Sequence, residues 1–402
     1  MVERFVVIGA GQACAQAVTT LRAEGFAGSV AIVGEEPYPP YQRPPLSKAY
    51  LAGTFERERL FLKPQAFYTE SHCELILDTA AVRIDREAHT VELSCSAMVS
   101  YEKLLLATGS RARRLAIEGA NLPGIHYLRG IADVDALRAN FGADKRLAVV
   151  GGGYIGLEVA AVARRLGLQV TVFEALDRVM ARAVSAEMSS FYESVHRDAG
   201  VRIEVNTAVD RFEGNGRLEA VHADGEVFPA DLALVGIGIV PNVGIAQHCG
   251  LACDDGIVVD DCARTADPHI FAAGDCTRHV GRDGALIRLE SVQNAIDQAK
   301  HAALAMLGKP APYREVPWFW SDQYDLKLQI AGLARLGDTL VRRGAPGSRK
   351  FAIFHLREGR VAAVEAVNAA PEYIVGRRLI AEGTPVAPER LADTSVPMKS
   401  IA

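Results

Sequence analysis

Two glycine-rich turns have the residue types and spacing that dinucleotide chemistry requires. One comprises residues 9–14 and the other residues 151–156, so that they begin 142 residues apart. In a G-x-G-x-x-G turn the first glycine permits a tight bend, and the second lets a pyrophosphate approach the backbone at the start of a helix. The two turns therefore predict two sites for dinucleotide phosphates.

An acidic residue follows each turn at the distance that a ribose requires. Glu35 lies 24 residues after Gly11, and Glu174 lies 21 residues after Gly153. A carboxylate about 20 residues beyond the turn accepts the ribose hydroxyls in this type of unit. Enzymes that use NADPH more often carry an arginine there for the 2′-phosphate, so Glu174 favours NADH, although Arg178 stands nearby.

The hydrophobic pattern predicts the strands and helices that position these residues. Each turn lies between a short apolar strand and a helical pattern that glycine ends, and a second apolar strand follows. The third glycine position holds Cys14 in the first copy and Gly156 in the second. The strands are expected at residues 5–8, 30–33, 147–150 and 170–173, and the helices end before Gly25 and Gly167. This repeated order predicts an α/β protein with two Rossmann-like domains.

Length and composition narrow the class of protein. The 402 residues suit two or three domains at about 150 residues each. A hydrophobic content of 49% excludes a disordered or fibrous chain, and a net charge of −5 argues against nucleic acid as the main partner. From the sequence we expect neither a signal peptide nor an apolar span long enough to cross a membrane. The seven dispersed cysteines indicate a reducing compartment, so we expect a cytoplasmic protein.

Further motifs resemble those of the two-dinucleotide-binding flavoprotein reductases, the FAD-dependent pyridine nucleotide-disulfide oxidoreductase superfamily. Residues 104–109 resemble its strand-end ATG motif, and residues 265–275 resemble its second flavin motif. Within the superfamily, three stretches resemble the ferredoxin reductases of bacterial oxygenase systems, namely residues 41–48, 151–158 and 317–323. The likeness runs over nearly the whole chain.

This resemblance implies an interrupted domain order. An FAD-binding domain would comprise residues 1–112 and 236–315, with an NADH-binding domain of residues 113–235 inserted in it. A C-terminal α+β domain of residues 316–402 would close the chain. Polar or Gly- and Pro-containing stretches at each seam agree with these boundaries.

The resemblance also assigns cofactor contacts residue by residue. Ala13 and Glu35 would hold the adenosine half of FAD, and Asp275 its ribityl chain. Val292 would start a helix whose positive end faces the flavin pyrimidine ring, where it would stabilise developing negative charge. The full FAD set is Gly9, Gly11, Ala13, Glu35, Arg43, Lys48, Val82, Ala107, Thr108, Gly109, Arg129, Asp275, Val292 and Trp320.

The implied NADH contacts lie in the second unit and after it. They are Gly151, Gly153, Ile155, Gly156, Glu158, Glu174 and Gly238. The resemblance places Glu158 beside the nicotinamide amide and opposite Lys48, and it favours Trp320 over Trp318 as the residue that covers the flavin. Lys48, Glu158 and Trp320 are therefore the expected catalytic residues.

The implied activity is electron transfer in aromatic hydrocarbon catabolism. Hydride would pass from NADH to FAD, and single electrons would then pass to an acidic 2Fe-2S ferredoxin, a task of positioning more than of acid–base catalysis. The ferredoxin would supply a Rieske-type dioxygenase or a haem-thiolate monooxygenase (cytochrome P450), and the sequence leaves open which. No cysteine lies between Cys14 and Cys73, which argues against the disulfide- and peroxide-reducing branches, and no metal site is expected.

Charge is distributed unevenly along the chain. Residues 316–402 hold 12 basic and 9 acidic residues, a net charge of +3, whereas the preceding 315 residues carry −8. A basic surface would attract an acidic ferredoxin. The expected steering residues are Lys300, Lys327, Arg335, Arg342, Arg343, Arg349 and Lys350.

Two other functions stay open at this point. A flavin NADH oxidase would consume oxygen without ferredoxin, and an apoptosis-inducing-factor-like protein would bind NADH as a signal more than as a substrate. The particular ferredoxin, the terminal oxygenase, its organic substrate and the choice between monomer and homodimer are also open.

Overall fold

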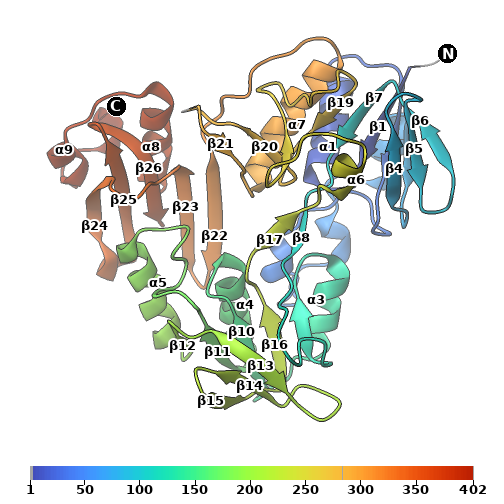
Figure 1. Cartoon of the computed structure of the whole chain (residues 1–402). Helices are drawn as coiled ribbons and strands as arrows, with labels where there is room; N and C mark the ends of the chain where they lie inside the picture. The colour runs from blue at the N-terminus through green and yellow to red at the C-terminus, as the bar shows by residue number, and fades with distance from the viewer. Residues whose placement is uncertain (1–2, 283, 402) are drawn as a thin grey trace. The chain divides into compact units, whose positions relative to one another are not determined.

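The computed structural model describes residues 3–282 and 284–401, which fall into two compact units (Figure 1). Unit 1 comprises the described residues up to Gln42, Arg57–Arg111 and Val240–Pro317. Unit 2 comprises Arg43–Glu56, Ala112–Ile239 and the described residues from Trp318 onward. The chain changes unit within a few residues of each predicted seam. Residues 43–56 group with unit 2, which the sequence analysis did not anticipate, and the division into three domains stays a prediction.

A five-stranded parallel sheet forms the centre of unit 1. Its strand order is β19-β7-β1-β2-β3, and every neighbouring pair is parallel. The bounds are β1 Arg4–Ile8, β2 Ser29–Val33, β3 Cys73–Ile76, β7 Lys103–Leu106 and β19 Ile270–Ala272. The predicted strands at 5–8 and 30–33 are confirmed as β1 and β2. Both are almost wholly buried, because two helices cover one face of the sheet and residues of a small antiparallel sheet pack on the other.

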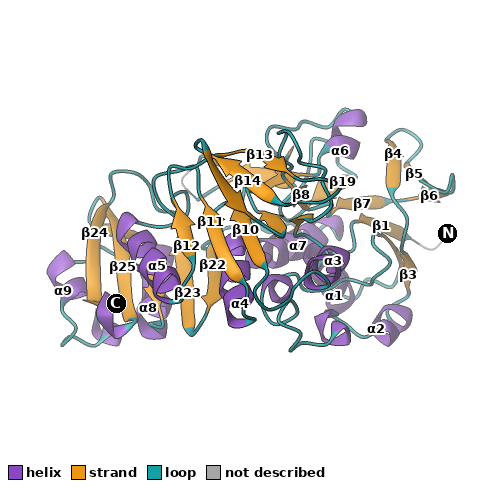
Figure 2. Cartoon of the chain, turned by 90° about the horizontal axis from the view of Figure 1, so that it is seen from below, coloured by secondary structure: helices purple, strands orange, loops and turns teal. Residues whose placement is uncertain are grey.

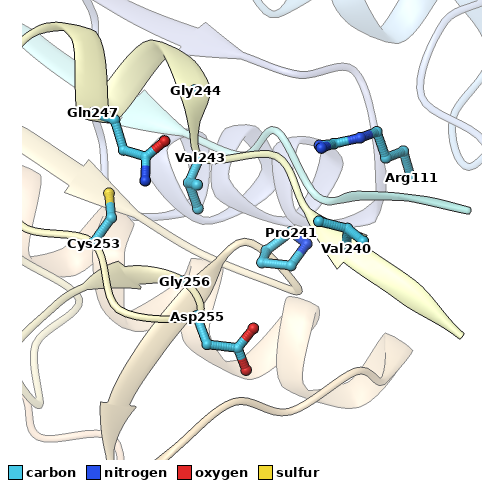
Figure 3. Close-up of a pocket in the computed structure, with 9 residues that line it drawn as sticks. All are labelled: Arg111, Val240, Pro241, Val243, Gly244, Gln247, Cys253, Asp255 and Gly256. Atoms are coloured by element: carbon cyan, nitrogen blue, oxygen red, sulfur yellow. The ribbon is translucent and has the colours of Figure 1, made fainter. Parts of the chain in front are cut away.

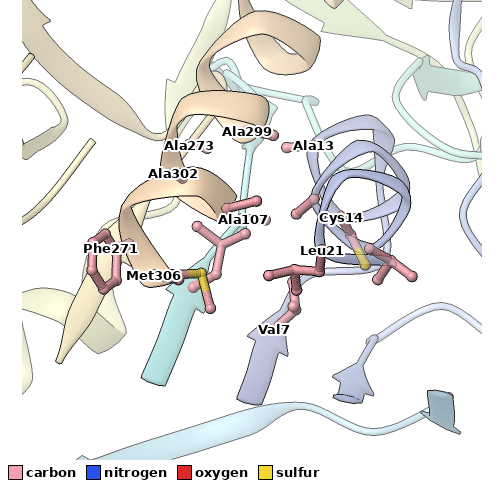
Figure 4. Packing of buried hydrophobic residues seen from close by; sticks show 14 of the residues in the cluster. Val7, Ala13, Cys14, Leu21, Ala107, Phe271, Ala273, Ala299, Ala302 and Met306 are labelled. Carbon is pink, nitrogen blue, oxygen red and sulfur yellow. The ribbon is translucent and has the colours of Figure 1, made fainter. Parts of the chain in front are cut away.

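Two helices pack on this sheet through small side chains. Helix α1 (Gln12–Ala23) follows the first glycine turn, and α7 (Val292–Met306) begins at the predicted residue. Figure 4 shows the two helices facing one another over β1 and β7. Alanines line the contact, which lets the helix axes approach closely; the buried members include Ala13, Ala17, Ala295, Ala299, Ala302 and Ala303.

Smaller elements complete unit 1. An antiparallel sheet contains β4 (Ala81–Asp85), β5 (Thr90–Leu93) and β6 (Met98–Ser100). A second small sheet contains β18 (Ile257–Val258), β20 (Thr277–Val280) and β21 (Leu286–Ile287). The short helices are η2 (Arg57–Leu60), α2 (Gln65–Glu70) and α6 (Gly244–His248). Strands β8 (Ser110–Ala112) and β17 (Ile239–Pro241) pair where the chain changes unit.

Unit 2 repeats the parallel arrangement. Its sheet has the order β12-β11-β10-β16-β9, with every pair parallel. The strands are β9 Ile125–Tyr127, β10 Arg146–Val150, β11 Gln169–Phe173, β12 Arg202–Glu204 and β16 Leu232–Val235. The helices are η1 Pro44–Ser47, α3 Ile131–Arg138, α4 Tyr154–Arg165 and α5 Ala186–Asp198. An antiparallel sheet adds β13 Val209–Glu213, β14 Ala220–Ala223 and β15 Glu226–Pro229.

The C-terminal part of unit 2 is a five-stranded antiparallel sheet with helices. Its order is β22-β23-β26-β25-β24, and α8 packs against β26 and β23. Figure 2 labels α8 together with β22, β23, β25 and β24 of this sheet. The bounds are β22 Trp318–Gln323, β23 Leu326–Gly332, β24 Thr339–Ala345, η3 Pro346–Ser348, β25 Lys350–Arg357, β26 Arg360–Val367, α8 Ala370–Glu382, α9 Pro388–Ala392 and η4 Met398–Ser400. The predicted fold class, two Rossmann-like folds and a C-terminal α+β region, is confirmed. Among the described residues, no helix is long and apolar enough to cross a bilayer.

Candidate functional site

The first glycine turn is held against the end of a neighbouring strand. Gly9 has a φ of +108°, and a Cβ there would lie 2.1 Å from the carbonyl oxygen of Ala107. Its N–H donates to the carbonyl of Val33 at 2.8 Å. Only glycine fits this turn, since a side chain would meet backbone at a conformation that L-residues rarely adopt. The turn therefore lies next to the ATG motif, as the sequence analysis requires.

The ATG motif is locked by the loop after β17. The Thr108 hydroxyl donates to the carbonyl of Asn242 at 2.7 Å, and the Asn242 side-chain amide donates to the carbonyl of Thr108 at 3.0 Å. The backbone N–H of Asn242 also donates to the carbonyl of Gly109 at 2.9 Å. These reciprocal bonds fix the backbone at the carboxyl end of β7, where ligands of parallel sheets bind.

The second flavin motif lies between the two helices. A Cβ on Gly274 would lie 3.7 Å from that of Ala13 on α1 and 3.6 Å from that of Ala295 on α7. Asp275 follows at once, and its carboxylate accepts a 2.9 Å hydrogen bond from the Ser110 hydroxyl. The structure thus gathers Ala13, the ATG strand end and Asp275 near the first turns of α1 and α7.

Three other predicted cofactor residues lie in unit 1, namely Glu35, Val82 and Val292. Glu35 is exposed two residues after β2, at the same edge of the sheet as the Gly9 turn. Val82 lies on β4 in the small antiparallel sheet and is 47% exposed. Val292 is the first residue of α7, whose N-cap Ser291 accepts a hydrogen bond from the Asn294 N–H. The roles of Glu35, Val82 and Val292 stay predictions.

The second glycine turn has the same construction with a tighter helix contact. Gly151 has a φ of +106°, and a Cβ there would lie 2.4 Å from the carbonyl oxygen of Gly236. A Cβ on Gly156 would lie 2.2 Å from the carbonyl oxygen of Gly151, so this third glycine is required. The Glu174 carboxylate folds back and accepts the N–H of Gly152 at 2.8 Å. Glu174 is therefore held at the turn itself.

Both turns leave the space that a phosphate needs. A Cβ on Gly11 or on Gly153 would have no heavy atom within 4 Å. These glycines are the N-caps of α1 and α4, and neither helix start has a side-chain cap. Uncapped N–H groups at a helix start attract anions. The two glycine turns therefore fit two dinucleotides. This arrangement defines a class of protein that binds one dinucleotide in each unit.

A buried carboxylate cluster lies on the helix that follows the second turn. Glu158 on α4 is 4% exposed, and its carboxylate lies 2.7 Å from the Lys48 ammonium. The Ser47 and Ser321 hydroxyls also donate to it, at 2.5 Å and 2.6 Å. The helix η1 brings Ser47 and Lys48 to α4, and the strand β22 brings Ser321. The structure thus joins Lys48 and Glu158 as the sequence analysis expects.

The aromatic residues of β22 alternate between its two faces. Phe319 packs against Tyr154 of α4, with ring centroids 4.6 Å apart, on the face that carries Ser321. Trp318 and Trp320 share the other face, with ring centroids 5.5 Å apart. Trp320 is partly exposed there. Its predicted contact with the flavin stays a prediction.

The other unit 2 candidates have defined places. The Arg43 guanidinium donates to the carbonyl of Arg129 at 2.5 Å, so these two residues are neighbours. Ile155 is 39% exposed in the first turn of α4. Gly238 is exposed, and its carbonyl accepts the N–H of Arg113 at 2.9 Å.

Sequence reasoning missed several members of the Glu158 cluster. No role was predicted for four buried residues, namely Ser47, Ser321, Gln323 and His196. Ser47 and Ser321 bind Glu158 directly, and hydrogen bonds connect Gln323 to Ser321 and His196 to Gln323. The available signal was the polar pair Ser321 and Gln323, two residues apart in an otherwise aromatic strand. Polar residues that share the inward face of a strand need partners.

The prediction that Arg343 is a steering residue is wrong. Arg343 is only 5% exposed, and its guanidinium binds Glu372 and the carbonyls of Leu391, Asp393 and Val396. It therefore fastens the C-terminal segment and is not available to a partner. Two others are engaged on the surface, since Arg342 pairs with Glu187 at 2.7 Å and Arg349 pairs with Asp325 at 2.6 Å. Lys300, Lys327, Arg335 and Lys350 are exposed.

Unit 1 also contains an open pocket and the seven cysteines of the chain. An open pocket of about 330 Å³ is lined by residues that include Arg111, Gln247, Cys253 and Asp255 (Figure 3). None of the predicted cofactor residues lines it. All seven cysteines are free thiols, and burial raises the pKa of Cys249 and of Cys253.

Comparison with known proteins agrees with this geometry. A family model described as pyridine nucleotide-disulphide oxidoreductase matches residues 3–299, and one described as reductase C-terminal matches residues 318–402. The chain therefore belongs to the pyridine nucleotide-disulphide oxidoreductases, flavoprotein enzymes that use FAD and NAD(H), with the additional reductase C-terminal domain.

Similar proteins extend over the whole chain. Rhodocoxin reductase of Rhodococcus erythropolis is 46% identical over 399 residues, which are 98% of this chain and 93% of that protein. The ferredoxin–NAD(+) reductase component of the anthranilate 1,2-dioxygenase system of Burkholderia cepacia is 41% identical over 408 residues, with 99% of each chain covered. The reductase in the crystal structure of the covalent putidaredoxin reductase–putidaredoxin complex superposes with a TM-score of 0.96 at 38% identity, covering 99% of this chain and 98% of that one.

Proposed function

We propose that this protein is an NADH-dependent ferredoxin reductase that delivers electrons to a 2Fe-2S ferredoxin of an oxygenase system. The observation that carries the proposal is the Lys48–Glu158 pair at 2.7 Å on the helix that begins at the second glycine turn. It supplies a buried, oriented carboxylate beside a dinucleotide site. The matched relative named as the ferredoxin–NAD(+) reductase component of a dioxygenase system supports the same conclusion.

The residues of unit 1 would hold FAD. Gly9 and Gly11 leave room for its pyrophosphate at the start of α1, and Asp275 offers a carboxylate directly after Gly274, which lies near α1 and α7. When bound, FAD supplies the conversion between a donor that gives two electrons at once and an acceptor that takes them singly. The protein's own contribution is to hold the cofactor and to direct the positive end of α7 toward developing negative charge.

The residues of unit 2 would hold NADH. Gly151 and Gly153 form the pyrophosphate turn, and Glu174 is fixed there by the Gly152 N–H, so that a ribose with free hydroxyls is preferred to one with a 2′-phosphate. Glu158 would accept a hydrogen bond from the nicotinamide carboxamide. Lys48 compensates the charge of Glu158, and the resemblance adds Trp320 as a cover for the flavin.

The partner would be an acidic 2Fe-2S ferredoxin. The solved complex of a reductase 38% identical to this chain with putidaredoxin supports this class of partner. The exposed Lys300 and Lys327 are the proposed steering charges. The ferredoxin would in turn serve a Rieske-type dioxygenase or a cytochrome P450, and the seven free thiols suit a reaction in the cytoplasm.

A ferredoxin-dependent assay tests the proposal. The purified holoenzyme is given NADH, a panel of 2Fe-2S ferredoxins and cytochrome c as the final acceptor. We expect cytochrome c reduction that requires a ferredoxin and is faster with NADH than with NADPH. Rapid NADH oxidation with oxygen alone, unchanged by any ferredoxin, would contradict the proposal and favour an NADH oxidase.

A further inference from the structure

The Glu158 carboxylate is the end of a longer buried chain of hydrogen bonds. Ser321 donates to it at 2.6 Å, and the Gln323 side-chain amide nitrogen lies 3.1 Å from the Ser321 hydroxyl oxygen. The Gln323 amide oxygen lies 2.8 Å from Nε2 of His196. The Tyr324 hydroxyl lies 3.2 Å from Nδ1 of the same ring. Ser321, Gln323 and His196 are each at most 1% exposed.

The chemistry of the groups determines which one donates and which one accepts in every hydrogen bond of this chain. An ionised carboxylate only accepts, so the single proton of the Ser321 hydroxyl points to Glu158. The Ser321 oxygen must then accept from the amide nitrogen of Gln323, which turns the amide oxygen toward His196. His196 therefore carries its proton on Nε2 and accepts the Tyr324 hydroxyl at Nδ1.

The surroundings of His196 agree with this neutral tautomer. Burial lowers the pKa of His196, so the ring is uncharged near neutral pH. A protonated ring would carry a second N–H and would need an acceptor in place of the Tyr324 proton. The bond directions and the charge state are thus consistent along the whole chain.

Local structure explains how these residues meet. The two-residue period of β22 puts Ser321 and Gln323 on the face that packs on α4. His196 lies in the last turn of α5. The chain of bonds therefore ties α5 and β22 to the carboxylate on α4, all within unit 2.

We propose that Ser321, Gln323 and His196 are positioning residues that hold Glu158 in one orientation for the nicotinamide carboxamide. This rests on the proposed function, which makes Glu158 a nicotinamide contact. A carboxylate has about four acceptor sites, and Ser47, Lys48 and Ser321 take three of them. One site is left for an amide N–H donor. Aligned hydrogen bonds also polarise one another, which strengthens the last one at Glu158.

Nucleotide affinity of the holoenzyme tests this proposal. Ser321→Ala removes the last donor, and Gln323→Met interrupts the chain with a side chain of similar length. Ser189→Ala is the matched control, because Ser189 is also fully buried, but its hydroxyl donates to the carbonyl of Val179 at 2.6 Å. Isothermal titration calorimetry with NAD⁺ gives the dissociation constant, steady-state kinetics give kcat and KM, and thermal unfolding gives stability.

We expect Ser321→Ala and Gln323→Met to raise the NAD⁺ dissociation constant and the KM for NADH about tenfold, with a smaller effect on kcat. Ser189→Ala should lower the melting temperature without changing the dissociation constant. The same affinity in Ser321→Ala as in Ser189→Ala would overturn the positioning role. Glu158→Gln tests the proposed function separately, since wild-type NAD⁺ affinity in that variant would overturn the role of Glu158 as a nicotinamide contact.

The His196 tautomer provides an independent readout. In ¹⁵N-histidine-labelled holoenzyme, the signal that disappears in His196→Gln identifies this ring. We expect a neutral ring protonated at Nε2 between about pH 7 and pH 8. A proton on Nδ1, or a charged ring in that range, would contradict the direction of the chain.

Discussion

The Lys48 ammonium lies 2.7 Å from the Glu158 carboxylate, although the two residues come from segments far apart in the sequence. Lys48 follows η1 in the segment Arg43–Glu56, and Glu158 is in the helix that the second glycine turn starts. The pair is one of several contacts between this segment and the rest of unit 2. It brings a residue that the resemblance assigns to the flavin against one that it assigns to the nicotinamide.

The first prediction concerns the coupling within this pair. Lys48→Met leaves a buried carboxylate without its counter-charge and should cost about 2 kcal/mol of unfolding free energy, less than a full buried-pair loss because Ser47 and Ser321 still donate. In the double variant with Glu158→Gln the charge is gone, so part of this cost should be recovered. Denaturant unfolding of both single variants and the double variant measures the coupling. Strict additivity would show that the two charges do not interact.

A second prediction separates the two dinucleotide sites. Gly153→Ala places a Cβ in open space at a φ of −78°, so the unfolding free energy should change by less than about 1 kcal/mol. The same methyl group would occupy the space of the NADH pyrophosphate, and NAD⁺ affinity should fall about tenfold or more. Gly11→Ala is the counterpart and should instead reduce the FAD retained on purification, seen in the visible absorbance. If the two variants had the same FAD content as each other and the same NAD⁺ affinity as each other, the assignment of FAD to the first turn and NADH to the second would be refuted.

The third prediction concerns the choice between NADH and NADPH. Glu174→Gln removes the charge of the carboxylate but keeps an oxygen that can accept the Gly152 N–H. Repulsion of the 2′-phosphate should weaken, and the ratio of kcat/KM for NADH over NADPH should fall about tenfold. Steady-state kinetics with both nucleotides measure the ratio. An unchanged ratio would mean that Glu174 does not face the ribose.

A fourth prediction is a loss of stability in acid that involves His279. Burial lowers the pKa of His279 to about 4, from an ordinary value of 6.5. As the pH falls below 6.5, the unfolded chain takes up a proton that the folded chain refuses, so stability is lost between pH 6.5 and about 4, by up to about 3 kcal/mol. Above pH 6.5 the ring is neutral in both states and the contribution is fully present.

Urea unfolding as a function of pH checks this prediction. His279→Leu should flatten the decline between pH 6.5 and 4, whereas replacing the exposed His248 by Gln should leave the curve unchanged. A decline of the same depth in His279→Leu would mean that other groups cause it.

The fifth prediction distinguishes a steering charge from a structural one. Lys327→Glu changes an exposed residue and should raise the ferredoxin concentration for half-maximal rate, with a weaker dependence on salt. Arg343→Met removes a buried guanidinium that binds Glu372 and three carbonyls, and it should lower the unfolding free energy by about 3 kcal/mol. Lys327→Glu with an unchanged half-saturating concentration would contradict the steering role.

Local pattern was sufficient to predict much of the fold. The strands around both turns follow from apolar runs and glycine positions, which act over a few residues, whereas the start of α7 at Val292 was implied by the family resemblance. Contacts between distant segments were harder to predict. The inward direction of Arg343 depends on the packing of the C-terminal segment, and the exposed or buried state of an arginine has no local signature.

In the candidate site, too, local sequence predicts some residues, whereas others are brought together only by folding. The glycine turns and Glu174 carry a spacing that sequence alone displays. The Ser321–Gln323–His196 chain depends on β22 packing against α4 and α5, which only the folded chain brings together. Polar residues in a buried strand indicate that partners exist, but they do not identify them.

In the proposed reaction, two electrons from NADH leave one at a time to a 2Fe-2S ferredoxin. The direct test is an anaerobic titration of the holoenzyme and excess ferredoxin with NADH, in which ferredoxin bleaching and NADH consumption are followed together. We expect two ferredoxins to be reduced for each NADH consumed, at a rate that Glu158→Gln lowers. NADH binding without ferredoxin reduction, or NADH consumption only after oxygen is admitted, would contradict it.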